Sequence, residues 1–204
     1  MQDFPLLGPR PAHDQLHEVI TRTELPDLPA PAVAERGPAT IEPLPDATPG
    51  QIVGLLEYLD ARGGKEDVFR IAADTHQEFG HMIGFVKAAE MLDFVDTPKR
   101  MVVLEPEGQG FVRAAPEDRK PIWREHLLRL RLFRDLHDVL QRQPRNEIEK
   151  EFVLETIILN MPQENYERVF NTLMGWARFG DLFDYDETTE TVSLPKEESP
   201  VEVS

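Results

Sequence analysis

The sequence predicts a mainly α-helical protein with small β-wings, arranged as tandem winged-helix-like units joined by a long helix. Three observations support this prediction. Apolar residues recur at every third or fourth position over several stretches, as they do in amphipathic helices. Pairs of short strand-like runs follow these stretches at two places in the chain. Proline is concentrated at the start, since residues 1–48 hold nine of the eighteen prolines.

This distribution divides the chain into five expected segments. The ends are too poor in apolar residues and too rich in proline and charge to offset the entropy lost on ordering. The segments are a Pro-rich, largely disordered segment (1–47), a first winged-helix-like unit (48–115), a long connecting helix (116–144), a second winged-helix-like unit (145–194) and a disordered acidic tail (195–204).

The first unit begins with a clear helix start. Thr48 is a suitable N-cap and Pro49 suits the first helical position. One face of this helix carries Ile52, Leu55, Leu56 and Leu59, and Gly63-Gly64 ends it. Second and third helices are expected at 66–75 and 78–92, followed by a hairpin with strands at 94–95 and 101–104 and a turn at 97–100. Pro106 then begins a short helix through Phe111 and Val112.

Residues 117–143 are predicted to form one long helix that Pro144 ends. Its apolar positions are Trp123, Leu127, Leu130, Phe133, Leu136 and Leu140. The second unit follows with helices at 147–159 and 163–177 and strands at 182–185 and 191–194. Its order resembles that of the first unit, but the two do not align well enough to be a sequence repeat.

Composition limits the classes of function. The formal net charge is −16, and residues 145–204 alone carry a balance of −9, which disfavours binding to nucleic acid. Cysteine is absent, so disulfides and thiolate metal sites are excluded. The chain has no apolar run long enough for a membrane helix and no signal-peptide pattern, so we expect it to be cytoplasmic.

The sequence contains no recognisable catalytic centre. It has no Gly-x-x-x-x-Gly-Lys-Ser/Thr loop, no His-Glu-x-x-His motif and no Asp-rich calcium loop. The pair Gly108-x-Gly110 is interpreted as packing between a wing and a helix, and His126 and His137 are expected at the edge of the long helix. We therefore expect no catalytic residues, no cofactor and no bound metal.

Two groups of residues are candidate partner contacts. Aromatic and arginine side chains crowd the second helix-to-wing junction at Trp176, Arg178, Phe179 and Tyr185. They form either a small aromatic core, which we favour, or an exposed hot spot for a partner. Arg131 and Arg134 belong to the mixed-charge face of the long helix, which suits an acidic or polar partner. The cleft between the two units is the default site for a small-molecule effector.

A winged helix also suggests a DNA-binding regulator, in which the third helix enters the major groove. Residues 77–91 contain a single lysine, Lys87, against Glu78 and Glu90. Such a helix lacks the cationic groups that phosphates require, so protein contacts are the better interpretation and DNA regulation is the alternative.

Two sequence blocks resemble the start and end of a known domain family. The blocks are residues 54–67, GLLEYLDARGGKED, and residues 176–186, WARFGDLFDYD. They are similar to the AAA-associated C-terminal domain, which follows the ATP-binding cassette in ABC transporters of the nitrate, sulfonate and taurine type. Further similar stretches include residues 78–80, 86–90, 93–100 and 130–133, with a fainter one at 13–25, a possible short helix by its spacing.

The resemblance implies a non-catalytic regulatory or assembly module of an importer for oxidised nitrogen or sulfur anions. Its partner would be the ABC transporter ATPase subunit, through which it would lie peripherally at the inner face of the membrane. The family provides no catalytic residues. Because the sequence contains no cassette, the module would act either as part of a longer ATPase or in trans beside a separate one.

Overall fold

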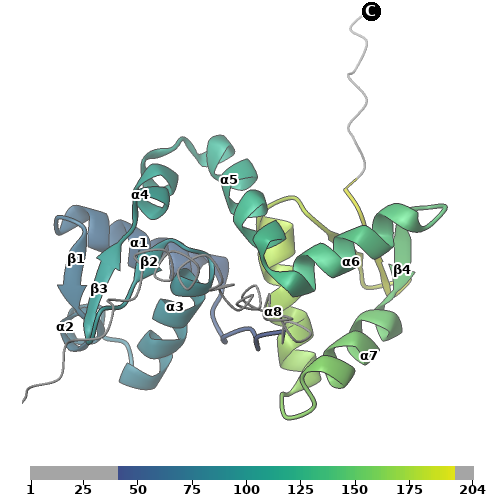
Figure 1. Cartoon of the computed structure of the whole chain (residues 1–204), viewed down its shortest axis with the longest axis horizontal. Helices are drawn as coiled ribbons and strands as arrows, with labels where there is room; N and C mark the ends of the chain where they lie inside the picture. The colour runs from purple at the N-terminus through teal and green to yellow at the C-terminus, as the bar shows by residue number, and fades with distance from the viewer. Residues whose placement is uncertain (1–40, 196–204) are drawn as a thin grey trace, which may run out of the picture. The chain divides into compact units, whose positions relative to one another are not determined.

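The computed structural model describes residues 41–195, where eight helices and six short strands occur (Figure 1). The predicted mainly α class with small antiparallel β elements is confirmed. The possible helix at 13–25 and the tail beyond residue 195 lie outside the described residues.

Residues 49–104 form a unit that we call the first repeat. It consists of α1 (Pro49–Ala61), β1 (Lys65–Asp67), α2 (Val68–Asp74), α3 (Phe79–Met91), β2 (Val95–Asp96) and β3 (Met101–Leu104). The predicted start of α1 is confirmed, because the Thr48 hydroxyl accepts from the Gln51 N–H and the Gln51 side chain accepts from the Thr48 N–H at 2.8 Å. Such a reciprocal capping box satisfies two N–H groups that the helix itself cannot.

Strand β1 was not predicted, because residues 66 and 67 were assigned to the second helix. The Asp67 side chain accepts from the Phe69 N–H at 2.9 Å and so caps α2, which begins at Val68. The three residues that end at this cap, Lys65–Asp67, are extended and pair antiparallel with β3. The first sheet therefore has three strands in the order β1-β3-β2 rather than a hairpin alone.

Residues 131–194 form the second repeat, with the same order of elements. It consists of α6 (Arg131–Arg142), β4 (Glu147–Glu149), α7 (Lys150–Asn160), α8 (Tyr166–Phe179), β5 (Asp184–Asp186) and β6 (Thr191–Ser193). Its sheet order, β4-β6-β5, corresponds to that of the first sheet. Here too the strand β4 precedes a helix that was predicted to begin at residue 147.

Backbone hydrogen bonds match the two repeats residue by residue. The Leu104 N–H donates to Gly64 O at 2.7 Å, and the Leu194 N–H donates to Asn146 O at 3.1 Å. In the same way, the Val68 N–H donates to Arg100 O at 3.1 Å and the Lys150 N–H to Glu190 O at 2.8 Å. Gly64 therefore corresponds to Asn146, and Arg100 corresponds to Glu190.

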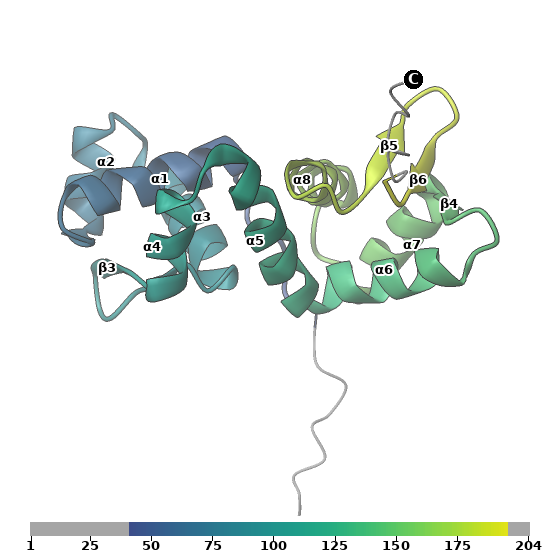
Figure 2. The ribbon, with the colours of Figure 1, turned by 90° about the horizontal axis from the view of Figure 1, so that it is seen from above.

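The predicted single helix at 117–143 is wrong. It is two helices, α5 (Pro116–Arg129) and α6, which meet at an angle in Figure 2. Leu130 ends one and caps the other with extended backbone, at φ −75° and ψ 128°. The apolar spacing continues through the break, and neither glycine nor proline marks it. Packing explains the break, because α6 buries Leu132, Phe133, Leu136 and Leu140 as the first helix of the second repeat.

Helix α4 (Pro106–Arg113) links the first repeat to α5. The prediction that the pair Gly108-x-Gly110 serves wing-to-helix packing is confirmed for Gly108 but not for Gly110, where a Cβ atom would meet nothing within 4 Å. A Cβ atom at Gly108 would lie 2.2 Å from the Phe94 carbonyl oxygen, a distance that no side chain tolerates. The backbone of α4 and the backbone at Phe94, where the first wing (β2 and β3) begins, therefore approach each other as closely as a glycine allows.

Candidate functional site

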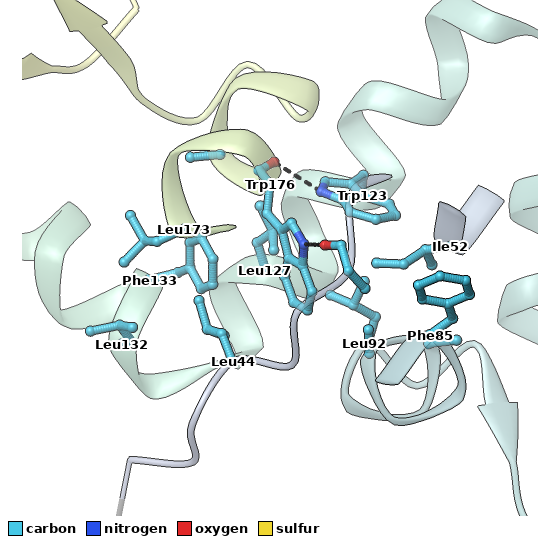
Figure 3. Close-up of a cluster of buried hydrophobic side chains, with 14 of the residues drawn as sticks. Leu44, Ile52, Phe85, Leu92, Trp123, Leu127, Leu132, Phe133, Leu173 and Trp176 are labelled. Carbon is cyan, nitrogen blue, oxygen red and sulfur yellow. Dashed lines mark hydrogen bonds between the residues drawn. The ribbon is translucent and has the colours of Figure 1, made fainter. Parts of the chain in front are cut away.

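The centre of the described structure is a junction of two tryptophans. Trp123 of α5 and Trp176 of α8 are both fully buried, with their rings 6.2 Å apart in an edge-to-face arrangement. The Trp123 Nε1–H donates to the Trp176 carbonyl oxygen at 3.0 Å, and the Trp176 Nε1–H donates to the Ala47 carbonyl oxygen at 2.7 Å (Figure 3). Both indole N–H groups are thus satisfied inside the core.

The segment before α1 is part of this junction. Ile41, Leu44 and Ala47 are buried, although composition assigned residues 1–47 to a largely disordered segment. Besides the bond to Trp176, the Leu44 carbonyl accepts from Arg168 Nη1 of α8 at 3.1 Å. Residues 41–47 therefore differ from the expectation because every third residue is buried and α8 supplies hydrogen-bond donors to the Leu44 and Ala47 carbonyls.

The predicted contact residues of α8 and β5 separate into two groups. Trp176 lies in the core, and Phe179 is half-buried with its ring 4.8 Å from that of Trp123. Arg178 is exposed and donates to the Tyr185 carbonyl oxygen at 3.3 Å. The structure thus brings the exposed Arg178 to the backbone of the half-buried Tyr185, while Trp176 and Phe179 pack against α5, as the core interpretation expects.

The predicted arginines of α6 also differ from each other. Arg131 is half-buried and its Nε lies 3.2 Å from Asp135 Oδ2, one turn along the helix. Arg134 is exposed and has no ion-pair partner among the described residues. Of the six candidates, Arg134 and Arg178 have exposed side chains that a partner could contact without rearrangement of the core, whereas Arg131, Phe179 and Tyr185 are half-buried and Trp176 is buried.

Several cavities lie beside α3 and α8 among the described residues. One of about 460 Å³ lies between residues 46–49 and α8, at the place expected for a small effector, whose binding stays a prediction. One of about 410 Å³ lies between α7, α8 and the second wing, which is the hairpin of β5 and β6. One of about 170 Å³ takes the corresponding place in the first repeat. We call the last two the second groove and the first groove.

The second groove contains a paired cation and two crossed aromatic rings. Lys150 Nζ lies 3.2 Å from Glu190 Oε1 and 5.8 Å above the Phe170 ring. The Phe170 and Tyr185 rings are 5.2 Å apart and nearly perpendicular. The hydrogen bond with Glu190 raises the pKa of Lys150 above its ordinary value. The groove therefore stabilises positive charge.

His126 lies in the core rather than at the edge of a helix. Its ring is 3% exposed and lies 4.5 Å from the Phe94 ring. Its Nδ1 has no hydrogen-bond partner among the described groups. Burial, with a smaller contribution from the Arg129 charge, lowers the pKa of His126. The ring is therefore neutral at pH 7.

Residues 41–195 contain neither a cluster suited to a metal ion nor a helix suited to spanning a membrane. No group of three or more His, Asp or Glu side chains there is arranged to hold a metal ion. No helix in that range is both long enough and apolar enough to cross a bilayer.

Comparison with known families identifies the chain. The family model of the C-terminal AAA-associated domain matches residues 69–186, more than half of the chain, and the chain therefore belongs to this family. The matched range extends from α2 to β5 and includes Trp123, Trp176 and most of the lining of both grooves, whereas Glu187 and Glu190 lie just beyond it. No curated protein and no solved structure is significantly similar to the chain. The family description implies a module associated with an AAA-type ATPase.

Proposed function

We propose that the chain is a non-catalytic regulatory or assembly module of the ATPase subunit of an ABC importer for nitrate-, sulfonate- or taurine-like anions. The observation that carries this proposal is the match of residues 69–186 to the C-terminal AAA-associated domain. The ATPase would be its direct partner, whether joined in one chain or bound in trans. The membrane would be reached only through the transporter.

The proposed contact surface is the exposed part of the second repeat around α6 and α8. Arg178 and Tyr185 lie together at the junction of α8 and β5, and Arg134 projects from α6. Arginine and tyrosine are the residue types that most often dominate binding energy at protein interfaces. Docking would shift the ATPase between open and closed states only if the module binds one state more tightly than the other.

Winged-helix DNA binding is less well supported. In the second repeat the helix that would enter the major groove is α8, and its Arg168 is already bound to Glu164 at 2.6 Å and to the Leu44 carbonyl. In the first repeat Lys87 is the single lysine or arginine of α3. Internal bonds thus occupy Arg168, and too few cations remain on either helix for the phosphates of DNA.

The test is affinity capture of the tagged chain from its native cells, with quantitative mass spectrometry of what it retains. We expect recovery of an ABC transporter ATPase or its membrane subunit. The variant Arg134→Glu/Arg178→Glu should lose most of that recovery. The matched control Arg70→Glu/Arg100→Glu reverses two exposed arginines of the first repeat, outside the proposed surface, and should retain it. Capture of DNA and polymerase subunits without any transporter subunit would sink the proposal.

A further inference from the structure

The second groove has a composition suited to one kind of ligand. It is lined by Lys150, Leu154, Glu167, Phe170, Asn171, Tyr185, Glu187 and Glu190. We propose that this groove binds an arginine or lysine side chain presented by a basic segment of a partner protein. The inference rests on the proposed function only for the identity of that partner, because binding of the cationic side chain can be tested with a peptide.

Lys150 shows how the groove holds a cation. Its ammonium group forms an ion pair with Glu190 at 3.2 Å and lies 5.8 Å from the centre of the Phe170 ring. An ammonium or guanidinium group at this distance over an aromatic face is attracted by the ring quadrupole. One end of the groove therefore already makes the two interactions that an incoming cation would need.

The rest of the second groove also offers carboxylates and an aromatic ring, but its lining there contains no further cation. Glu167 and Glu187 are exposed and have no ion-pair or hydrogen-bond partner among the described residues. Three glutamates thus face a single lysine. The Tyr185 ring stands nearly perpendicular to Phe170 and supplies a second aromatic wall. The cavity volume of about 410 Å³ leaves room for a further side chain.

An arginine fits these groups better than a lysine. A guanidinium is planar, so it stacks on an aromatic ring while its N–H groups reach two carboxylates at once. A lysine ammonium can pair with the carboxylates but lacks the planar surface for stacking. We therefore expect the groove to prefer arginine-containing segments.

The first groove shows that the fold does not impose this charge. It is lined by the cationic side chains of Lys87, Lys99 and Arg100, with Glu90. Arg100 corresponds to Glu190 by the shared backbone hydrogen bond, so the same position carries opposite charge in the two repeats. The acidic and aromatic lining of the second groove belongs to its side chains and not to the backbone arrangement.

Binding is tested by calorimetry with the acetylated, amidated peptides hexa-arginine and hexa-lysine and full-length protein. The variant Glu167→Gln/Glu187→Gln removes two charges from the groove. Asp138→Asn/Glu155→Gln removes two charges from exposed positions that do not line it. We expect about tenfold weaker hexa-arginine binding for the groove variant and less than about threefold for the control, as two ion pairs in a partly enclosed site would give. Equal weakening of both would mean that the acidic surface as a whole attracts the peptide, and would overturn the proposal.

A second pair of variants tests the location independently. Lys150→Met removes the internal cation and leaves Glu190 available, so hexa-arginine should bind several-fold more tightly. Lys87→Met removes one positive charge in the other repeat and should leave the affinity nearly unchanged. Amide shifts in a ¹⁵N spectrum should follow Tyr185 and Glu187. Shifts confined to other surfaces would overturn the assignment.

Two other results separate this inference from its alternatives. If the wild-type chain dimerises in sedimentation experiments and Glu167→Gln/Glu187→Gln abolishes the dimer, the occupant is a second copy of the chain and a partner's basic segment is excluded. If the transporter ATPase is captured equally by wild type and groove variant, the groove is not its contact and the inference fails while the proposed function stands. Intact peptide binding without capture of any transporter subunit would sink the proposed function alone.

Discussion

The two repeats share a backbone arrangement but carry different side chains at corresponding positions. In each repeat, the residue directly before the first strand has positive φ: 85° at Gly64, before β1, and 54° at Asn146, before β4. In both, an aspartate with positive φ follows the third helix, Asp93 at 56° and Asp181 at 49°. The hydrogen bonds that close the turns and sheets fix these backbone conformations, so both repeats share them. The side chains that line the two grooves take no part in those bonds, and the first groove is net positive whereas the second is net negative.

The junction between the repeats is where their equivalence ends. Trp123 belongs to neither repeat, yet its ring contacts Phe94 of the first and both Trp176 and Phe179 of the second. Phe111 of α4 completes this cluster. The repeats therefore depend on α5, an element that has no counterpart elsewhere in the described chain.

The largest expected effect comes from Trp123→Ala, which empties a fully buried position between the repeats. We expect a loss of about 3–5 kcal/mol in the free energy of unfolding, as for other buried aromatic truncations. Urea unfolding followed by circular dichroism measures it. Trp176 is then the only tryptophan, so its fluorescence reports on the second repeat. The control Leu159→Ala, at a site 80% exposed, should change little. A loss below about 1 kcal/mol for Trp123→Ala would contradict the central role of the junction.

The next effect distinguishes Gly180 from its counterpart Leu92. Both cap their helices with nearly the same backbone, φ −91° for Gly180 and −88° for Leu92. Backbone conformation therefore does not require the glycine. A Cβ at Gly180 would lie 2.9 Å from Trp123 Cδ1 and 3.3 Å from the Arg124 nitrogen, so the close approach of α5 requires it.

Gly180→Ala should therefore destabilise the chain by about 1–3 kcal/mol, the usual cost of overpacking. The matched control is Gly175→Ala in the same helix, where a Cβ meets no atom within 4 Å. That control should stabilise by up to about 1 kcal/mol through helix propensity. Thermal or urea unfolding of both variants gives the comparison. Two changes of the same sign would show that α5 does not constrain Gly180.

Local chemistry made part of this fold predictable from sequence. Thr48, Pro49 and Gln51 define the start of α1 within four residues, and the structure confirms it. Strand β1 escaped prediction because its three residues pair with β3, which lies more than thirty residues away. The break at Leu130 escaped because the apolar spacing on both sides is continuous.

The candidate site was predictable to a similar degree. The crowding of aromatic residues near Trp176 indicated a core, and Trp176 lies in one. The second groove could not be predicted, because Lys150, Phe170 and Glu187 come from two helices and a wing that only the tertiary fold brings together. The role of Trp123 was likewise hidden, since its spacing fits a continuous helix as well as it fits the junction.

His126 of α5 gives the stability of the chain a pH dependence that can be isolated. Its folded-state pKa is lowered, so the unfolded chain takes up the proton first as the pH falls. Stability is therefore lost below the unfolded pKa of about 6.5, by at most about 1.4 kcal/mol per pH unit, until the folded ring is also protonated. Urea midpoints at pH 7.5 and pH 5.5 should fall less for His126→Leu than for wild type. His81→Gln, at an exposed site, should behave as wild type does.

The smallest expected effect concerns Asn146, which holds the left-handed conformation that Gly64 holds in the first repeat. Asparagine tolerates this conformation at a modest cost, and glycine has none. Asn146→Gly removes that cost but adds freedom to the unfolded chain, so the two contributions nearly cancel. We expect a change within about 0.5 kcal/mol in urea unfolding, and a loss of about 1–2 kcal/mol for Asn146→Val, whose branched side chain is strained at positive φ. The reciprocal variant Gly64→Asn should also be tolerated, because the nearest atom to its Cβ would be Leu104 Cβ at 3.9 Å, an ordinary contact. If Asn146→Gly cost as much as Asn146→Val, the asparagine side chain itself would stabilise the second repeat, and the two turns would be equivalent in conformation but not in the interactions that maintain it.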